Sequence, residues 1–322
     1  MKKIVWLACA ALAVLIQAPH SYAQSWPQRS VKLVVALGPG SGADLSARLI
    51  ADRLTKRWGQ AVVVENRPGG DGVVAINAVL SARDDHTLLY APTSTFVGHP
   101  YTLEKLPYDP KQLVPVARVT NTVVVIAVPA SLPAKSMKEL IAAVRAQPGK
   151  MNWSTAVGMT DIIFAGYFKN SGLDMAQVRY RDTVSAMNDL VEGRIQLYAG
   201  AYVIARSHVL AGKVRVLAVT NRSRAPGLAD VPTVAEAGFP DLTFDGLVGA
   251  FVARSAGMSD AVRERIAADI KAAVTEPEVS ARLAATVQIV NPGSPAEFAA
   301  AINEQAGQLA TFAKALGIEA KR

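Results

Sequence analysis

Cysteine and histidine are scarce in this chain of 322 residues, which contains one Cys and four His. A single thiol excludes an internal disulfide and any zinc cluster built from several cysteines. Four imidazoles leave little material for a His-rich metal site, so we expect no bound metal. Aromatic residues make up only 6% and charged residues 19%, against 51% hydrophobic residues. This composition excludes a disordered chain, collagen and a disulfide-stapled miniprotein, and the length fits about two domains.

Long runs of one charge sign are also missing, although the formal net charge is +8. Basic residues such as Arg53, Lys56 and Arg57 are spread over segments with helical spacing, and acidic residues interleave with the basic ones in the C-terminal part. Nucleic-acid-binding proteins concentrate their basic residues in patches, often beside aromatic residues. We therefore expect solvated helix faces and no nucleic-acid partner.

The longest apolar run lies at the N-terminus and is too short to cross a bilayer comfortably. Lys2 and Lys3 precede 13 apolar residues at positions 4–16, and small residues follow at Ser21 and Ala23. This pattern predicts a secretory signal peptide over residues 1–23, cleaved after Ala23, and a periplasmic mature protein. The alternatives are an uncleaved anchor or a lipoprotein signal at Cys9. Cleavage would remove the only Cys and lower the net charge to +6.

Strand-like and helix-like segments alternate along the rest of the chain. An apolar, β-branched run at residues 31–37 leads through a glycine-rich turn into the helical pattern of Gly42–Trp58, and further strand–helix pairs follow. This order predicts an α/β fold with two lobes, each a mostly parallel sheet flanked by helices. We assign residues 24–123 and 246–322 to lobe 1 and residues 124–245 to lobe 2. The ligand cleft is expected between the lobes, at the carboxyl ends of the strands.

The glycine-rich loop after the first strand has more than one interpretation. Gly38, Gly40 and Ala43 satisfy a G-x-G-x-x-A pattern between a strand and a helix, and Glu65 ends the next strand, where an acid would bind a dinucleotide's ribose. Pro39 in the tight turn and the predicted export argue against a nicotinamide cofactor. The more general interpretation is an anion site, because a helix N-terminus presents unpaired N–H groups and the positive end of its dipole. A plain strand–helix connection is the remaining possibility.

A second loop repeats this arrangement in the predicted lobe 2. A strand at residues 152–156 leads into a helix that begins near Thr160, and Thr155 and Thr160 offer hydroxyl groups. Two helix N-termini facing one cleft would clamp the two ends of a dicarboxylate. Whether they face each other depends on the tertiary structure.

Taken together, these segments closely resemble the tripartite tricarboxylate transporter substrate-binding proteins, the extracytoplasmic solute receptors also called Bug proteins. The resemblance covers Trp26 to Ile318. Its most distinctive segments are VKLVV at 31–35, PGSGAD at 39–44, VENRPG at 64–69, LPYDP at 106–110, SLPA at 131–134, LAVT at 217–220 and VPTVAEAG at 231–238. So many matches in the right order are specific to the family, although any one alone would not be.

The resemblance implies a type II periplasmic-binding-protein fold that closes on a small organic solute, usually a carboxylate. Such a receptor delivers the solute to a membrane permease made of a large and a small subunit, and we expect a monomer without a cofactor. The ligand contacts implied come from two strand–helix loops of lobe 1 and three segments of lobe 2. They are Leu37, Gly38, Ser41, Gly42, Ala43, Asp44, Thr93, Ser94, Thr95, Thr155, Gly158, Met159, Thr160, Arg181, Thr183, Gly200 and Ala201. Asp44 is acidic, so we expect it to cap the helix, hold water or receive a donor group rather than bind a carboxylate.

The loops that would hold the solute depart from the family pattern. Val157 and Met159 stand at usual glycines, Ile163 at a usual His, Asp182 at a usual Gly and Gly200 at a usual Asp. These changes leave the receptor role intact and predict a tighter or more apolar pocket.

Catalytic signatures are absent from the sequence. No G-x-S-x-G, H-E-x-x-H or P-loop segment occurs, and no His pairs with a nucleophile and an acid in a known arrangement. His99 could edge the cleft or be structural. We therefore expect a binding protein and not an enzyme; the alternative is an exported NAD-dependent or hydrolytic enzyme that uses the loop at residues 38–43.

Overall fold

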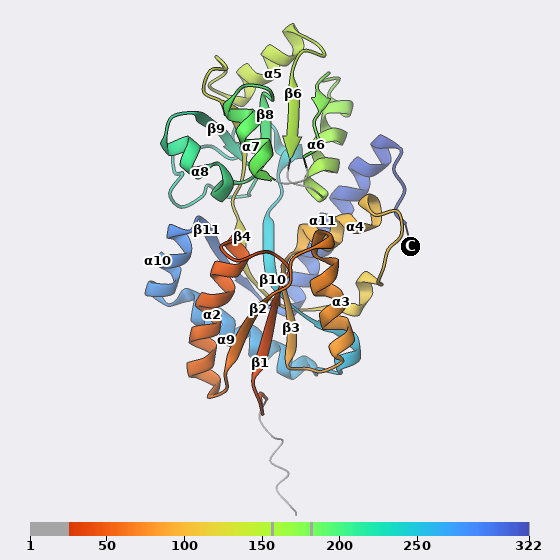
Figure 1. The fold of residues 1–322 in the computed structure, drawn as a ribbon, viewed down its shortest axis with the longest axis vertical. Helices are drawn as coiled ribbons and strands as arrows, with labels where there is room; N and C mark the ends of the chain where they lie inside the picture. Colours follow the sequence, from red (N-terminus) through yellow and green to blue (C-terminus); the bar gives the residue numbers. More distant parts are fainter. Residues whose placement is uncertain (1–25, 156–157, 181–182, 322) are drawn as a thin grey trace, which may run out of the picture.

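The computed structural model describes residues 26–155, 158–180 and 183–321, which form two lobes stacked end to end (Figure 1). The predicted signal peptide at residues 1–23 lies outside the described residues, as do Val157, Arg181 and Asp182. The two-lobe α/β fold is confirmed: each lobe contains one sheet with helices on both of its faces.

The first sheet has six strands in the order β11-β4-β10-β3-β1-β2. They are β1 (Val31–Val35), β2 (Val62–Asn66), β3 (Thr87–Pro92), β4 (Leu113–Thr122), β10 (Gly246–Ala253) and β11 (Gln288–Gly293). β1 is parallel to β2 and β3, whereas β10 is antiparallel to β3 and β4, and β11 is antiparallel to β4. Leu33 and Val34 are both buried because helices cover both faces of the sheet, which explains the continuous apolar run of β1.

The second sheet has five strands in the order β7-β6-β8-β5-β9. They are β5 (Val124–Pro129), β6 (Asn152–Thr155), β7 (Ala176–Gln177), β8 (Leu197–Ala201) and β9 (Val214–Val219). β6 is parallel to β7 and β8, whereas β5 is antiparallel to β8 and β9.

Both sheets are therefore mixed, which corrects the expectation of mostly parallel sheets. The chain passes from the first sheet to the second at Val123, between β4 and β5, and returns between β9 and β10. β5 and β10 each enter a sheet from the other lobe, so each begins at the interlobe side. The strands that precede helices end at that side, so β5 and β10 are antiparallel to their neighbours. The apolar stretch at residues 114–128 consequently divides between the two sheets.

Several helices begin and end where local signals predict. The helices are α2 (Gly42–Trp58), α3 (Val73–Ala82), α4 (Thr93–Thr102), α5 (Met137–Ala146), α6 (Met159–Asn170), α7 (Thr183–Val191), α8 (Tyr202–Leu210), α9 (Asp260–Thr275), α10 (Pro277–Ala285) and α11 (Pro295–Leu316). Ser41 and Ser259 cap α2 and α9 through their side chains, and Ser294 forms a capping box with Glu297 at the start of α11.

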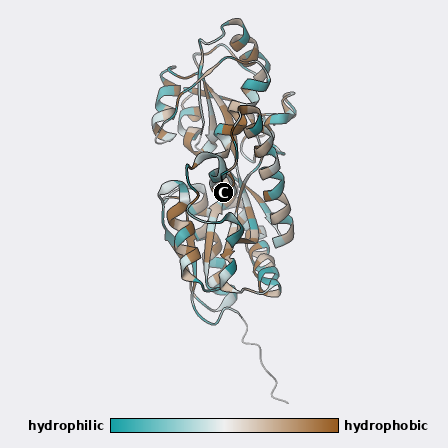
Figure 2. Cartoon of the chain, turned by 90° about the vertical axis from the view of Figure 1, so that its right-hand side faces the viewer, coloured by the Kyte–Doolittle hydropathy of each residue, from teal (hydrophilic) through white to brown (hydrophobic). Residues whose placement is uncertain are grey.

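The apolar cores run along the whole molecule, and Figure 2 shows its elongated shape from a second direction. One cluster lies between the first sheet and α2, α9 and α10, and another lies beneath α7 and α8 of the second sheet. The third includes residues of α3, α4 and α11 in lobe 1 and of α5 and α6 in lobe 2. α11 packs along α6 so closely that a Cβ atom on Gly166 would lie 2.8 Å from the Phe312 ring. The C-terminal helix therefore joins the lobes along one side.

Candidate functional site

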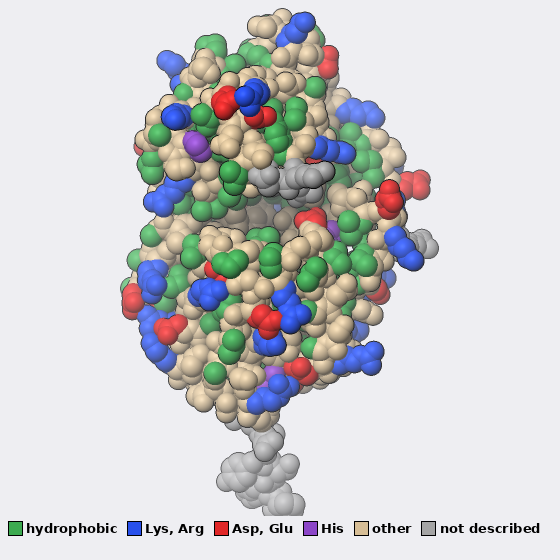
Figure 3. Space-filling view, in the orientation of Figure 1, with side chains coloured by type: hydrophobic (Ala, Val, Ile, Leu, Met, Phe, Trp, Pro, Cys, Tyr) green, Lys and Arg blue, Asp and Glu red, His purple; other side chains and the backbone are tan. Residues whose placement is uncertain are grey.

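The molecule is hollowed between its two lobes, as Figure 3 shows. The carboxyl ends of β1 and β3 reach this region from one lobe, and those of β6 and β8 reach it from the other. α4 and the N-terminus of α6 meet there: a Cβ atom on Gly98 would lie 2.9 Å from the Met159 backbone nitrogen. A Cβ atom on Gly158 would lie 3.4 Å from the Ser94 carbonyl oxygen. Ser94, Gly158 and Met159, three of the residues expected in the site, are thus brought together across the lobes.

The buried Asp44 side chain accepts hydrogen bonds that hold the loop between β1 and α2. The residue is only 2% exposed; Oδ2 accepts a hydrogen bond from the Gly40 N–H at 2.9 Å, and Oδ1 accepts from Arg48 Nε at 3.0 Å. Asn66 Nδ2 donates to Oδ1 at 2.9 Å, and the Asp44 N–H donates to Ser41 Oγ at 3.2 Å. Burial alone would raise the pKa of Asp44, but the hydrogen bonds from Arg48, Gly40 and Asn66 outweigh it and lower that pKa. Of the roles expected for Asp44, the structure shows it accepting hydrogen bonds from donor groups. These bonds hold the loop between β1 and α2 in place.

Two residues that sequence reasoning did not include in the site shape the same loop. Asn66 Nδ2 also donates to the Leu37 carbonyl at 3.0 Å, which ties the end of β2 to the loop after β1. Gln288 of β11 lies over the start of α2, where a Cβ atom on Gly42 would be 2.3 Å from its Nε2. Gln288 Oε1 in turn accepts a hydrogen bond from Thr120 at 3.3 Å. A side chain at position 42 would therefore displace this buried amide.

Thr93, Ser94 and Thr95 form the first turn of α4 rather than a loop. Thr93 is fully buried and donates to Gln305 Oε1 of α11 at 2.6 Å. The Thr95 side chain points into its own lobe: its methyl group would be 2.4 Å from a Cβ atom on Gly72. Ser94 is the one of the three whose main chain lies against lobe 2, at Gly158.

The first turn of α6 contains an acidic residue, Asp161. Gly158 precedes the helix with φ at 102°, a conformation that favours glycine, and Thr155 Oγ1 donates to Asp161 Oδ1. Burial raises the pKa of Asp161, and the charge of Asp71 in the other lobe adds to this rise, whereas Thr155 and Arg179 oppose it. Both helix N-termini expected to bind an anion thus hold a carboxylate in their first turn, and at α2 Arg48 balances that charge.

The remaining site residues lie at the ends of β8 and α7. Gly200 and Ala201 face Val125 and Val124 of β5, directly after the crossing between the lobes. Thr183 is the first residue of α7, and Arg181 lies outside the described residues.

Comparison with known proteins decides the family of this chain. A family model for the tripartite tricarboxylate transporter family receptor matches residues 46–318. The chain belongs to this family. A UPF0065 protein of Bordetella bronchiseptica is 32% identical over 301 residues, which cover 93% of this chain and 89% of that protein. The Bug-type relationship expected from the sequence motifs is confirmed.

Solved structures agree with this assignment. A periplasmic transporter superposes with a TM-score of 0.78 at 29% identity, over 92% of this chain and 99% of that one. An R. palustris protein with adipate superposes with a TM-score of 0.79 at 26% identity, over 91% and 99% of the two chains. The protein is therefore a solute-binding receptor of the tripartite tricarboxylate transporter type.

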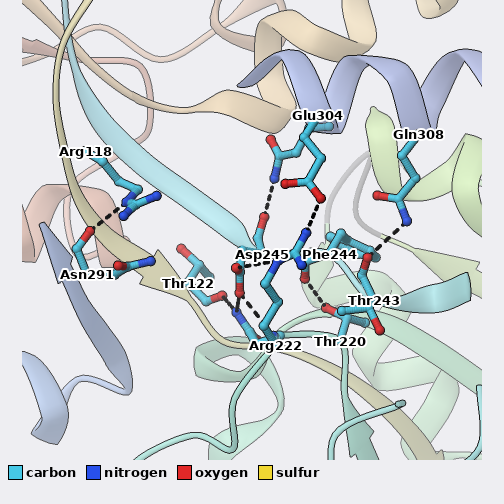
Figure 4. Close-up of polar contacts among 12 residues, drawn as sticks. Arg118, Thr122, Thr220, Arg222, Thr243, Phe244, Asp245, Asn291, Glu304 and Gln308 are labelled. Atoms are coloured by element: carbon cyan, nitrogen blue, oxygen red, sulfur yellow. Dashed lines mark hydrogen bonds and ion pairs between the residues drawn. The ribbon is translucent and has the colours of Figure 1, made fainter. Parts of the chain in front are cut away.

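A buried asparagine connects the two crossings between the lobes of this receptor. Asn221 Oδ1 accepts from the Val124 N–H at 3.1 Å, and its Nδ2 donates to the Thr122 carbonyl at 3.1 Å and to Asp245 Oδ1 at 3.3 Å. Arg222 pairs with Asp245, with Nε 3.6 Å from Oδ2, as Figure 4 shows. The outgoing crossing and the return crossing are consequently connected by one side chain.

α11 attaches to the return crossing from lobe 1. Gln305 Nε2 donates to the Asp245 carbonyl at 2.6 Å. Gln308 Nε2 donates to the Thr243 carbonyl at 3.0 Å, as Figure 4 shows. Because Gln305 also accepts from Thr93, one amide links the return crossing to the first turn of α4. No local pattern in the sequence marks these residues, since their partners lie dozens to hundreds of positions away.

His99 is structural. It is fully buried, with Nδ1 2.6 Å from the Tyr108 hydroxyl and Nε2 2.9 Å from the Asp71 carbonyl. Within the described ranges, no three His, Cys, Asp or Glu side chains are grouped so that they could hold a metal ion. No helix in the described part of the chain is long and apolar enough to cross a membrane.

The acid required by the dinucleotide interpretation is engaged elsewhere. Glu65 Oε2 lies 2.9 Å from Lys32 Nζ, and its other oxygen pairs with Arg67. Hydrogen bonds from Lys32 and Arg67 lower the pKa of Glu65. The carboxylate is thus part of a surface ion-pair group beside β1 and β2.

Proposed function

We propose that this receptor captures a small organic carboxylate, of the linear dicarboxylate type, in the hollow between its lobes. The observation that carries the proposal is the meeting of α4 and the α6 N-terminus across the lobes, at Ser94, Gly158 and Met159. The first N–H groups of α2 and α6 have no acceptor within their own helices and can donate to a carboxylate. Adipate bound in the structurally similar R. palustris protein supports the same solute class.

The proposed site comprises the residues expected from the sequence. One group of them would contact the solute, and a second group would support the segments that carry the first. The backbone of residues 38–43 and of 158–160, with Ser41, Ser94 and Thr160, would contact the solute, together with Arg181, Thr183, Gly200 and Ala201. Asp44, Thr93 and Thr95 support these segments from within lobe 1, and Thr155 supports Asp161 in lobe 2.

The proposed mechanism is capture by closure. A solute that contacts both lobes stabilises the closed form by its differential affinity for that form. The crossings at residues 123 and 220–245 would act as the hinge, between lobe 1 (24–123 and 246–322) and lobe 2 (124–245). The closed monomer would then deliver the solute in the periplasm to a permease of a large and a small subunit, without catalysis and without a cofactor.

Solute binding can be tested directly on the purified exported protein. Native mass spectrometry would detect retained solute, and calorimetry with succinate, glutarate and adipate would measure affinity, with adipamide as the uncharged control. A dicarboxylate at a hundredfold excess over its Kd should stabilise the fold by about 2.7 kcal/mol. Binding of none of the three acids, or equal binding of adipamide, would contradict the proposal. Recovery of the solute unchanged after long incubation would separate binding from turnover.

A further inference from the structure

The end of β8 carries a tyrosine and a glycine on one face. Tyr198 and Gly200 are two positions apart, so their side-chain positions lie on the same side of the sheet. Tyr198 belongs to the apolar cluster beneath α7 and α8. Gly200 pairs with Val125, and the next residue pairs with Val124, directly after the crossing between the lobes. The strand therefore ends at the interlobe side, beside the proposed solute site.

The Tyr198 hydroxyl lies over the glycine. A Cβ atom on Gly200 would be 2.3 Å from Tyr198 Oη and 2.6 Å from its Cζ. The ring thus leans along the strand toward the interlobe end, and its hydroxyl occupies the space that a side chain at position 200 would fill. Only glycine at position 200 leaves this space to the Tyr198 hydroxyl.

This hydroxyl has no hydrogen-bond partner among the described residues, although its atom is buried. Three other buried or half-buried tyrosines have one: Tyr90 pairs with Ser46 at 2.9 Å, Tyr108 with His99 at 2.6 Å and Tyr180 with Asp189 at 2.6 Å. A buried hydroxyl without a partner is costly, so such a group calls for a specific explanation. Burial also raises the pKa of Tyr198, so the hydroxyl stays protonated and can donate.

We propose that the Tyr198 hydroxyl donates a hydrogen bond to an oxygen of the bound solute and is a specificity-determining group of lobe 2. The proposal rests on the proposed function and narrows it. The solute must present an acceptor oxygen, such as one end of a dicarboxylate, at the carboxyl end of β8. The Tyr198 ring packs in the apolar cluster, whereas its hydroxyl makes no hydrogen bond to a described residue that the solute-free receptor would lose.

The Tyr198→Phe variant tests this assignment because it removes only the hydroxyl. We expect succinate, glutarate or adipate, whichever the wild type binds most tightly, to bind about 10- to 100-fold more weakly to this variant in calorimetry. The solute-free variant should melt at the same temperature as wild type or above it, because an unpaired buried hydroxyl has been removed.

Tyr108→Phe is the matched control, because the Tyr108 hydroxyl has a protein partner in His99. Its melting temperature should fall while its solute affinity stays within about twofold of wild type. Equal affinity of wild type and Tyr198→Phe, or a lower melting temperature of solute-free Tyr198→Phe, would overturn the assignment of Tyr198 alone. A wild type that binds none of the three acids would overturn the proposed function, and the assignment of Tyr198 would fall with it.

Discussion

Replacing Asp44 by Asn should weaken both the fold and the first binding loop. The variant keeps the shape of the side chain but removes its charge and turns one acceptor oxygen into a donor. Asp44 accepts from Gly40 and Asn66 at 2.9 Å and from Arg48 at 3.0 Å, and its side chain is 3% exposed. The amide of the variant would face at least one of these donors without bonding to it.

The magnitude follows from the number and kind of these contacts. Hydrogen bonds to a charged group contribute about 1.5–3 kcal/mol each, and a buried donor left unpaired costs about 1–3 kcal/mol. The Arg48 side chain is 51% exposed, so water can replace part of its contribution. We therefore expect a loss of about 3 kcal/mol in the free energy of unfolding, which for a chain of this length corresponds to about 5 °C in Tm.

The pH dependence gives this prediction a second, independent readout. The folded-state pKa of Asp44 is lowered from its usual 3.8, so its stabilisation is complete above that value and is lost as the pH falls through the folded-state pKa. Urea unfolding should show the full difference between wild type and Asp44→Asn near pH 7 and a much smaller one near pH 2.5. Asp52→Asn on the exposed side of α2, where Asp52 pairs with Lys56, is the control and should change stability by less than about 0.5 kcal/mol. An Asp44→Asn protein as stable as wild type near pH 7, or a difference independent of pH, would refute the reasoning.

Three further substitutions test the contacts between the lobes. Gly98→Ala should raise the helix propensity of α4, yet its methyl group would meet the Met159 backbone at 2.9 Å. We therefore expect at least tenfold weaker solute binding in calorimetry, and unchanged affinity would contradict the lobe contact. Asn221→Ala removes three hydrogen bonds at the crossings between the lobes, one buried and two partly buried, and should cost about 3 kcal/mol in urea unfolding, whereas a loss below about 1 kcal/mol would argue against the role of Asn221 there. Phe312→Ala opens a cavity between α11 and α6 and should cost about 3–4 kcal/mol, with Thr311→Ala on the exposed side of α11 as a nearly neutral control.

Local sequence signals predicted the helices whose ends are capped within a few residues. α2, α9 and α11 have the expected bounds because Ser41, Ser259 and Ser294 each bond to a backbone N–H three positions on. α4 and α7 were not expected, since no side chain caps α4 and Pro100 lies inside it. β11 was also not expected, because only its pairing with β4 makes it a strand.

The scarcity of cysteine, the order of strands and helices and the family motifs were therefore enough to establish a two-lobe solute receptor. The tertiary structure decided which strands turn antiparallel at the crossings and which side chains hold the binding loops. Folding brings Asn66 to Asp44, Gln305 to Thr93 and Thr122 to Asn221, and Thr93 and Gln305 are 212 positions apart. Such contacts depend on how the sheets and helices pack, and the sequence around each residue carries no physical trace of them.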